Sequence, residues 1–573
     1  MVVNVIEVKD LRFRYRNSED RILKGIDLNV EKGEFLLLVG PSGCGKTTLI
    51  NSINGIIPHV IKGVQKGTVR VLDMEIPKTP LREISKHVGT VFQNPETQFF
   101  MLRVIDELVF GPENLKVPPE EIERRLERVT EVIPGLKEIL YKETLSLSGG
   151  QKQKVAIASV MMMGAKILIL DEPTTNLDPR GAKEVLEAIN AIREQKDITI
   201  ILIEHRLDEV ARFADRVIVM NEGEIIREGD PRKVFSDPML FYDLGIRPPQ
   251  PAELIVKLKA EGLIDDNEPI PLTVDEAVDI LKKYIPDGFS REPKDEEYEP
   301  SGEPAIEIRD LRYVYPDGTV ALRGVSMNIY KGEYVGIIGQ NGAGKSTLVM
   351  NILGVLEPSY GYVKVLGKDV KNTPVEEIAK SVGVIFQNPD LMLFQSTVWD
   401  EIALGPRNLR LERDEIHARV NESIDMMRLK GLEKRHPHAL SRGQRHRVAV
   451  ASILAMRPKV LVADEPTTGQ DYGASRRYLS LLKKLNEEGR TIIVISHDMK
   501  VIAEFAKRVI VMKKGRVLMD GPTRKVFDRE DILAETYLEP PKITQIAKRL
   551  GLGPILTTDE FVQAMKAALA KER

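Results

Sequence analysis

The 573-residue chain has a single cysteine, Cys44. One thiol excludes an intrachain disulfide, a zinc site held by cysteines and an iron–sulfur cluster with four cysteine ligands. Low cysteine usage is typical of a reducing compartment, and we therefore expect a cytoplasmic protein.

Long apolar runs are also lacking. A membrane-spanning helix needs roughly 18 to 20 uncharged apolar residues in a row, and the best candidate, residues 155–170, is short and contains Lys166. The first ten residues, MVVNVIEVKD, carry acidic residues where a secretory signal would have a basic region and an apolar run. We predict that the chain neither spans a membrane nor is exported by an ordinary signal.

Neither charge sign is in large excess, because 83 Lys and Arg oppose 86 Asp and Glu, which gives a formal charge of −3. This balance argues against a nucleic-acid partner bound through a basic surface. A composition of 42% hydrophobic and 29% charged residues is that of a globular protein with sizeable cores. The length predicts between about two and five domains.

The chain does contain an internal repeat that covers most of its length. Five motifs recur in unchanged order at separations of 292 to 299 residues: GPSGCGKTT and GQNGAGKST, VFQNP and IFQNP, LSGGQ and LSRGQ, LILDEPTT and LVADEPTT, ILIEH and IVISH. The sequence therefore predicts a tandem duplication.

Each copy predicts an α/β domain. Apolar runs at 35–39, 167–170 and 198–203 have the length of buried parallel strands, and amphipathic stretches at 120–132 and 181–195 have the length of helices. Such alternation favours a mostly parallel sheet with helices on its faces, a helical subdomain and a helical tail. We expect a first domain at 1–235, its helical tail at 236–285, an acidic proline-rich linker at 286–304, a second domain at 305–528 and a C-terminal helical tail at 529–573.

A glycine-rich loop follows an apolar strand and opens a helix in each copy. Glycines let backbone N–H groups point at phosphate oxygens, and Lys46 and Lys345 add positive charge for the outer phosphates. Tyr15 and Tyr315, which lie 31 and 30 residues before these lysines, could stack on adenine or could belong to a core. The predicted ATP-binding residues are Tyr15, Gly40, Pro41, Ser42, Gly43, Cys44, Gly45, Lys46, Thr47, Thr48, Tyr315, Gly339, Gln340, Asn341, Gly342, Ala343, Gly344, Lys345, Ser346 and Thr347.

Paired carboxylates follow a later strand in both copies. Because ligands collect at the carboxyl edge of a parallel sheet, the aspartate of each pair is expected to hold Mg²⁺ and the glutamate to polarise a water molecule. The predicted Mg²⁺ ligands are Thr47, Ser346, Gln93, Gln387, Asp171 and Asp464. The predicted catalytic residues are Glu172, Glu465, His205, His497, Gln93 and Gln387, the histidines contacting the γ-phosphate and the glutamines reaching Mg²⁺ or the attacking water.

Taken singly, each of these residues has a structural explanation. A glycine-rich turn, a solvated acidic pair and a histidine at a strand end are all common. Their matched order in two copies favours the functional interpretation.

These motifs cover nearly all of both halves and resemble the ATP-binding cassette (ABC) ATPases, in which the LSGGQ element makes the match specific. The resemblance implies two ATP molecules held head to tail between two cassettes. Ser148, Gly149, Gly150 and Gln151 would face the ATP at Lys345, and Ser441, Arg442, Gly443 and Gln444 the ATP at Lys46.

Arg442 departs from the pattern, since it replaces the first signature glycine, and its guanidinium could reach phosphate or point into solvent. Asp178 and Asp471 keep the aspartate that follows the carboxylate pair in the family. Because both lysines, both glutamates and both histidines persist, we predict two hydrolysing sites that need not be equally fast.

The stretches FQNPETQFFMLRVIDELVFGPENL and FQNPDLMLFQSTVWDEIALGPRNL are similar to those of energy-coupling-factor (ECF) transporter ATPases. This resemblance implies an energising subunit of an importer for a vitamin or a metal ion, peripheral on the cytoplasmic face of the membrane. Its partners would be a membrane-embedded coupling (T) subunit and a substrate-binding (S) subunit. Phe99, Phe100, Leu393, Phe394 and Trp399 could form the surface that accepts a partner helix, or could lie in the core.

The sequence disfavours two other functions. A tandem ABC ATPase of translation or DNA maintenance is disfavoured by the missing cysteine cluster, the missing long charged or coiled-coil insertion and the neutral charge balance. A fused ATPase of a sugar importer usually has one decayed cassette, whereas the motifs of both copies are intact here.

Overall fold

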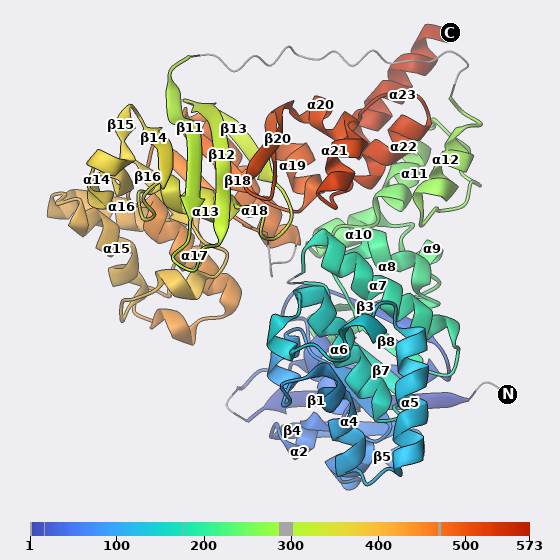
Figure 1. Cartoon of the computed structure of the whole chain (residues 1–573). Helices are drawn as coiled ribbons and strands as arrows, with labels where there is room; N and C mark the ends of the chain where they lie inside the picture. Colours follow the sequence, from blue (N-terminus) through green and yellow to red (C-terminus); the bar gives the residue numbers. More distant parts are fainter. Residues whose placement is uncertain (1–2, 17, 176, 286–301, 468–471, 573) are drawn as a thin grey trace. The chain divides into compact units, whose positions relative to one another are not determined.

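The computed structural model describes residues 3–16, 18–175, 177–285, 302–467 and 472–572. The chain divides into two compact units, Met1–Ile285 and Pro286–Arg573. Figure 1 colours the first from blue to green and the second from yellow-green to red. The predicted linker at 286–304 lies outside the described residues except for its last three.

A six-stranded, mostly parallel sheet forms the centre of each unit. Its order is β10-β9-β3-β8-β7-β6 in the first unit and β20-β19-β13-β18-β17-β16 in the second, and only the β9–β10 and β19–β20 pairs are antiparallel. The predicted α/β fold class is therefore confirmed. The strands are β3 (Phe35–Val39), β6 (Val88–Val91), β7 (Ile167–Asp171), β8 (Thr199–Ile203), β9 (Arg216–Asn221), β10 (Glu224–Gly229), β13 (Tyr334–Ile338), β16 (Val382–Ile385), β17 (Val460–Asp464), β18 (Thr491–Ile495), β19 (Arg508–Lys513) and β20 (Arg516–Pro522).

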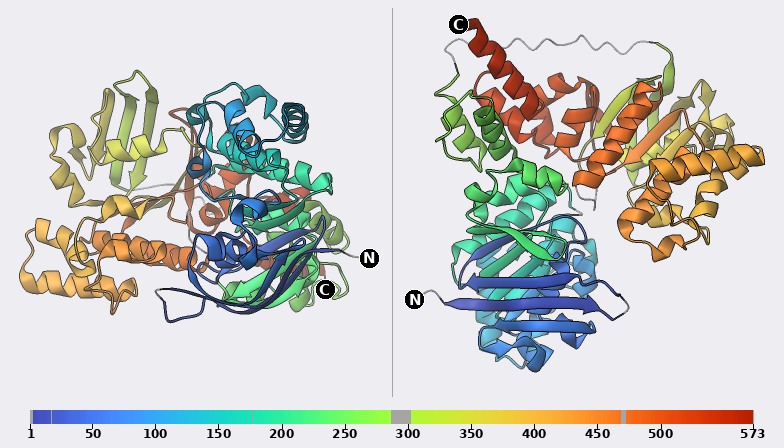
Figure 2. Two further views of the ribbon diagram at one scale, coloured as in Figure 1. Left: turned by 90° about the horizontal axis from the view of Figure 1, so that it is seen from below. Right: turned by 180° about the vertical axis from the view of Figure 1, so that it is seen from behind.

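A second, antiparallel sheet of four strands accompanies each parallel sheet, with the order β2-β1-β4-β5 or β12-β11-β14-β15. The long blue strands in the right view of Figure 2 belong to this sheet of the first unit. We did not predict it from the sequence. Its strands are β1 (Asn4–Tyr15), β2 (Leu23–Glu31), β4 (Gly63–Val71), β5 (Met74–Glu75), β11 (Pro304–Val314), β12 (Val320–Tyr330), β14 (Tyr360–Val365) and β15 (Lys368–Asp369).

Helices cover the parallel sheets and form a subdomain and a tail in each unit. None of the described helices is long and apolar enough to cross a bilayer. In the first unit they are α1 (Lys46–Ile53), α2 (Ile56–His59), α3 (Leu81–Ile84), α4 (Val104–Asn114), α5 (Pro119–Val132), α6 (Gly149–Met162), α7 (Pro179–Glu194), α8 (Leu207–Val210), α9 (Pro231–Val234), α10 (Pro238–Asp243), α11 (Gln250–Ala260) and α12 (Val274–Leu281). In the second they are α13 (Lys345–Ile352), α14 (Val375–Ala379), α15 (Val398–Asn408), α16 (Arg413–Met426), α17 (Arg442–Leu454), α18 (Tyr472–Glu487), α19 (Met499–Phe505), α20 (Thr523–Asp528), α21 (Glu530–Glu535), α22 (Lys542–Arg549) and α23 (Thr558–Glu572).

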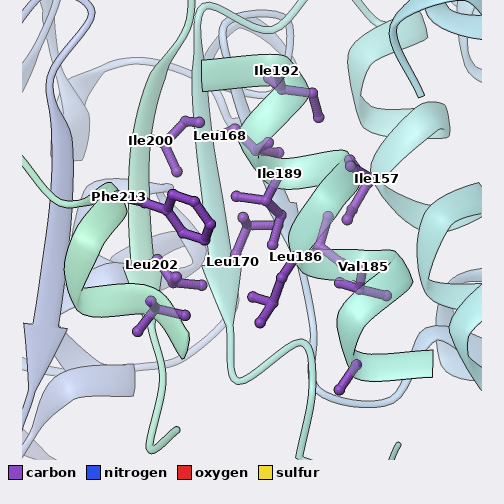
Figure 3. Packing of buried hydrophobic residues seen from close by; sticks show 14 of the residues in the cluster. Ile157, Leu168, Leu170, Val185, Leu186, Ile189, Ile192, Ile200, Leu202 and Phe213 are labelled. Atoms are coloured by element: carbon purple, nitrogen blue, oxygen red, sulfur yellow. The ribbon is translucent and has the colours of Figure 1, made fainter. Parts of the chain in front are cut away.

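Both faces of the parallel sheet are buried, which explains why its strands are continuous apolar runs. Leu168 and Leu170 of β7 pack toward α7, where Figure 3 shows them beside Ile189. Ile167 and Ile169 of the same strand belong to the core on the opposite face, which the antiparallel sheet covers. Successive side chains of a strand point to opposite faces, so a strand covered on both sides must be apolar at every position.

Each helical tail is tied to its own cassette by an arginine–glutamate pair. Arg232 lies 2.9 Å from Glu276 of α12, and Arg524 lies 2.7 Å from Glu560 of α23. In the first unit the backbone N–H of Gln250 also donates to the Asp208 carboxylate, with an N···O distance of 2.6 Å. The tails are therefore integral to the units that carry them.

A buried ion pair in the second unit generates a stability prediction. Arg508 is 3.0 Å from Glu333, and their side chains are 7% and 3% exposed. Removing the arginine leaves a buried carboxylate without its cation, so we expect Arg508→Ala to lower the free energy of unfolding by about 3–5 kcal/mol. Trp399, the one tryptophan in the chain, packs against this unit's core. Its fluorescence reports the unfolding of this unit in urea.

The matched control is Arg216→Ala in the first unit, where Arg216 pairs with Glu34 at 2.8 Å but is 23% exposed. This control should move the Trp399 transition much less. An equal shift in both variants contradicts the prediction.

Candidate functional site

The glycine-rich loop of the first unit connects β3 to α1. Gly43 and Gly45 have φ angles of 81° and 108°, a backbone region that side chains strongly disfavour. The Lys46 ammonium donates to the carbonyls of Gly40 and Pro41 at 2.7 and 2.9 Å. The loop therefore folds around the lysine, which is only 6% exposed.

The second unit repeats this arrangement between β13 and α13. Gly342 and Gly344 have φ angles of 76° and 97°, and Lys345 donates to the carbonyls of Gly339 and Gln340 at 2.6 and 3.0 Å. All the predicted loop residues, Gly40–Thr48 and Gly339–Thr347, thus occupy the turn and first helical residues after a central strand. An anion at this helix start would meet both backbone N–H groups and the lysine.

The carboxylate pairs lie at the carboxyl end of β7 in the first unit and of β17 in the second. Asp171 Oδ2 accepts from the Thr47 hydroxyl at 3.3 Å. Glu172 and Glu465 follow with φ angles of 50° and 49°, which is a strained conformation for a residue other than glycine. The backbone N–H groups of these glutamates donate to Ile203 and Ile495 at 3.0 and 2.8 Å, which fixes that conformation.

The predicted histidines and one predicted glutamine contact these glutamates. His205 Nε2 lies 2.9 Å from Glu172 Oε1, and Gln93 Nε2 donates to Glu172 Oε2 at 3.3 Å. In the second unit His497 Nδ1 lies 2.8 Å from Glu465 Oε2, while Gln387 is exposed two residues after β16. The histidine–glutamate contact was not foreseen, since the sequence pattern pointed each histidine at phosphate.

Burial and charge separate the two carboxylates of each pair. Burial, reinforced by the charge of Glu172, raises the pKa of Asp171 to about 6. Burial acts on Glu172 as well, but its hydrogen bond to His205 and the nearby charges bring the pKa of Glu172 below its ordinary value. Burial and the neighbouring Glu465 also raise the pKa of Asp464 to about 6. The glutamate is therefore the carboxylate that stays ionised most readily in the first unit.

The donor set at this edge fits Mg²⁺. The Thr47 hydroxyl and the Asp171 carboxylate are in contact, and such hard oxygen ligands suit an ion that also binds substrate phosphates. Among the described residues no group of three or more His, Cys, Asp or Glu side chains could hold a metal by itself. Thr47 and Asp171 would hold the ion in the first unit, and Ser346 and Asp464 in the second.

The signature residues start helices α6 and α17. Ser148 and Gln151 form a reciprocal capping box, with bonds of 3.1 and 3.3 Å. Ser441 and Gln444 form the same box at 3.0 and 3.3 Å. Arg442 occupies the first helical position of α17 and is exposed.

The packing behind the two signatures differs. A side chain at Gly150 would meet the Gly181 backbone at 2.7 Å, whereas at Gly443 nothing lies within 4 Å. Gly149 is exposed. Asp178 caps α7 by accepting from Gly181 at 2.8 Å, and Asp471 lies outside the described residues.

The two tyrosines lie beside the phosphate loops. Tyr15 bonds the Thr48 hydroxyl at 2.9 Å and Tyr315 bonds that of Thr347 at 3.0 Å. Each ring meets the preceding aromatic ring edge to face, Phe13 or Tyr313, with centroids 5.0 Å apart. Both tyrosines are therefore positioned next to the loop, and stacking on adenine stays a prediction.

The apolar residues after each glutamine divide into two groups. Phe99, Leu393 and Trp399 pack against the cores, whereas Phe100 and Phe394 are 73% and 72% exposed. Sequence reasoning missed the residues that hold these phenylalanines outward. The buried carboxylates of Glu107 and Glu401 accept from the backbone N–H groups of Phe100 and Phe394 at 2.8 and 2.6 Å.

An ion pair joins the segment after each glutamine to the signature helix. Lys152 of α6 lies 2.5 Å from Glu96, and Arg445 of α17 lies 2.6 Å from Asp390. These pairs occupy corresponding positions in the two copies. The repeated opposite charges were visible in the sequence, but we did not predict the ion pairs from them.

Comparison with known proteins gives consistent matches. Residues 23–175 and 322–468 each match a family model described as ABC transporter. A protein of Caldanaerobacter subterraneus subsp. tengcongensis, named as a candidate ABC transporter ATP-binding protein, is 43% identical over 98% of this chain and 99% of its own. A similarly named protein of Methanosarcina mazei is 40% identical over 98% of this chain and 97% of its own.

Among solved structures, cbiO1 from Clostridium perfringens, titled as part of the ABC transporter complex cbiONQ, is 36% identical. The match covers 43% of this chain and 100% of that one, with a TM-score of 0.38.

Cys44 generates a prediction about the first phosphate loop. Its thiol is buried, 4% exposed, and burial raises its pKa above the ordinary value of 9.0. The thiolate is then less than about 3% populated at pH 7.5, and it grows about tenfold per pH unit. We expect N-ethylmaleimide to modify native Cys44 about 100-fold more slowly than in the urea-unfolded chain, and faster at higher pH.

The control is Cys44→Ala, which copies Ala343 of the second loop. This variant should keep ATP affinity within about twofold. Mass spectrometry follows the modification, and rapid labelling of the native protein at neutral pH contradicts the assigned burial.

Proposed function

The chain belongs to the ABC transporter ATP-binding family and is a tandem ABC ATPase, and from that premise we propose that it energises an importer of ECF type. In this proposal ATP closes the two cassettes on each other and hydrolysis reopens them. The motion drives uptake of a vitamin or a metal ion through a coupling subunit and a substrate-binding subunit in the membrane. The chain works on the cytoplasmic face.

The observation that carries the transport role is a series of contacts in the first unit that leads from the carboxylate pair to an exposed apolar surface. In the first unit Gln93 contacts Glu172, Glu96 is paired with Lys152 of the signature helix, and Phe100 is exposed. A partner bound at Phe100 would therefore move with both the glutamine and the signature helix. Exposed apolar residues that lie together in this way mark a site where a partner binds.

In the proposed reaction Lys46 and Lys345 exchange their loop carbonyl contacts for phosphate oxygens. Water attacks the γ-phosphorus, its proton passes to the glutamate, and the bond to the bridging oxygen of the ADP leaving group breaks. Glu172 can accept this proton because its pKa lies below the ordinary value, so that the side chain is ionised at neutral pH, and His205 holds its carboxylate. Mg²⁺, when bound, would neutralise charge on the phosphates.

Each nucleotide is proposed to lie between the loop of one cassette and the signature of the other. A serine and helix-start N–H groups suit a γ-phosphate, so Ser148 and Gln151 would complete the Lys345 site and Ser441 and Gln444 the Lys46 site. Joining both cassettes in one chain makes their encounter intramolecular and raises the effective concentration.

Replacing the proposed bases tests the reaction. We expect Glu172→Gln or Glu465→Gln alone to reduce steady-state ATP turnover, and the double variant to reduce it by about 100-fold or more, because general-base catalysis typically contributes that much. Released phosphate is measured with saturating MgATP. The exposed Glu131→Gln in α5 serves as the control, and a fully active single variant of either kind contradicts the prediction.

Replacing the exposed apolar residues tests the membrane role. Phe100 and Leu102 are 73% and 74% exposed. We expect Phe100→Ser with Leu102→Ser to reduce co-purification of membrane partners from detergent-solubilised native membranes at least about fivefold, with ATPase activity within about twofold of the parent.

A matched control replaces two exposed valines elsewhere in the first unit, Val60 and Val64, which are 65% and 50% exposed. That control should bind partners normally. Recovery of ribosomes or DNA with no membrane protein overturns the transport role and favours the soluble alternative.

A further inference from the structure

Corresponding surfaces of the two units have different chemistry. We define coupling surface 1 by the exposed apolar residues Phe100, Leu102, Tyr141 and Leu145, which are 73 to 76% exposed. In the second unit the corresponding positions hold Phe394, Ser396, Lys434 and His438, and we define coupling surface 2 by Phe394, Lys434 and His438 together with the exposed Leu391, Arg435 and His436 beside them. Between the apolar residues of the first surface, the exposed Lys142 and Glu143 balance each other in charge, whereas the corresponding residues of the second surface are Arg435 and His436.

Each surface consists of two chain segments that are joined by backbone hydrogen bonds. In the first unit Val104 and Thr144 donate backbone bonds to Lys142 and Leu102 at 3.0 and 2.8 Å. In the second unit Val398 and Trp399 donate to Arg435 and Glu433, both at 3.0 Å. The exposed side chains of the two segments therefore share one face of each unit.

The charges around coupling surface 2 are not balanced. Residues 428–447 contain seven Arg or Lys and one acid, whereas the corresponding residues 135–154 contain four and two. Lys434 and Arg435 are exposed, and no ion pair joins them to a carboxylate of the described residues.

The acids near coupling surface 2 are already engaged within the chain. Asp390 pairs with Arg445 at 2.6 Å, and Asp400 pairs with Arg407 at 3.0 Å. The buried Glu401 carboxylate accepts from the backbone of Phe394, and Glu433 accepts from the backbone N–H of Gly431 at 3.0 Å. Among the described residues, no carboxylate therefore forms an ion pair with Lys434 or Arg435.

We propose that the membrane partner presents two chemically different segments to this chain. An apolar helix docks on coupling surface 1, and a helix with an apolar residue flanked by carboxylates docks on coupling surface 2. The inference rests on the proposed transport function and specifies its partner.

The physical reason is the cost of desolvating charge. An apolar helix over Lys434 and Arg435 would remove their hydration and offer no interaction to offset that cost. Carboxylates would offset the cost of desolvation and also speed the encounter by long-range attraction. Carboxylates placed against Tyr141 and Leu145 would lose water in the same way. The wrong assignment is thus disfavoured at both surfaces, and the partner can bind in one orientation only.

Site-specific crosslinking tests the proposal on the full chain. A photoreactive benzoylphenylalanine replaces Phe100 in one variant and Phe394 in another, and each is irradiated in detergent-solubilised native membranes. Mass spectrometry then sequences the crosslinked segments. We expect two different segments of membrane protein, an apolar one at position 100 and one with a net negative charge at position 394.

Charge reversal adds a quantitative readout. Lys434→Glu with Arg435→Glu should reduce the crosslink at position 394 by about tenfold and leave that at position 100 within about twofold. The matched control, Lys483→Glu with Lys484→Glu, reverses two exposed lysines of α18 and should change neither crosslink.

The outcomes separate the two proposals. One and the same segment at both positions, or a basic or uncharged segment at position 394, overturns the inference and leaves the transport role standing. Crosslinks only to ribosomal or other soluble proteins, or no membrane crosslink at either position, overturn both.

Discussion

The arrangement of each unit depends on holding two adjacent carboxylates at the end of a buried strand. Asp171 and Glu172 repel each other, and burial disfavours their charge. The neighbouring strand β8 stabilises the pair. It ends at Ile203, whose carbonyl accepts a hydrogen bond from the Glu172 N–H, and His205, two residues further on, contacts the Glu172 carboxylate. Parallel strands bring these segments together although more than 30 residues separate them. The left-handed backbone at Glu172 and Glu465 is the local strain on which this arrangement depends.

The strands of the parallel sheet were predictable because burial on both faces leaves only apolar residues in them. The run at 35–39 coincides with β3, and those at 167–170 and 198–203 differ from β7 and β8 by one residue at one end. The antiparallel sheet escaped prediction because one side of β1 is exposed, so charged residues interrupt its apolar pattern. Its alternation was present in the sequence and was not sought.

At the site, the residues that share a local motif were predictable and their mutual contacts were not. The phosphate loops, the carboxylate pairs and the signature helix starts could be identified because backbone geometry demands those residue types at fixed spacing. The bond from His205 to Glu172 and the support of Phe100 by Glu107 join segments whose relative placement follows only from packing. No residue pattern distinguishes a supporting glutamate such as Glu107 from the exposed acids around it.

The hydrogen bond between Gln250 and Asp208 joins the first tail to the segment that carries His205. Asp208 is three residues beyond His205, and it accepts a bond from the start of α11, 42 residues further along the chain. If the histidine segment shifts when γ-phosphate is released, the anchor of α11 shifts with it. Substitutions in that helix can then alter turnover without contacting nucleotide, which gives evolution a place to tune the rate of the cycle while the phosphate-binding residues remain fixed.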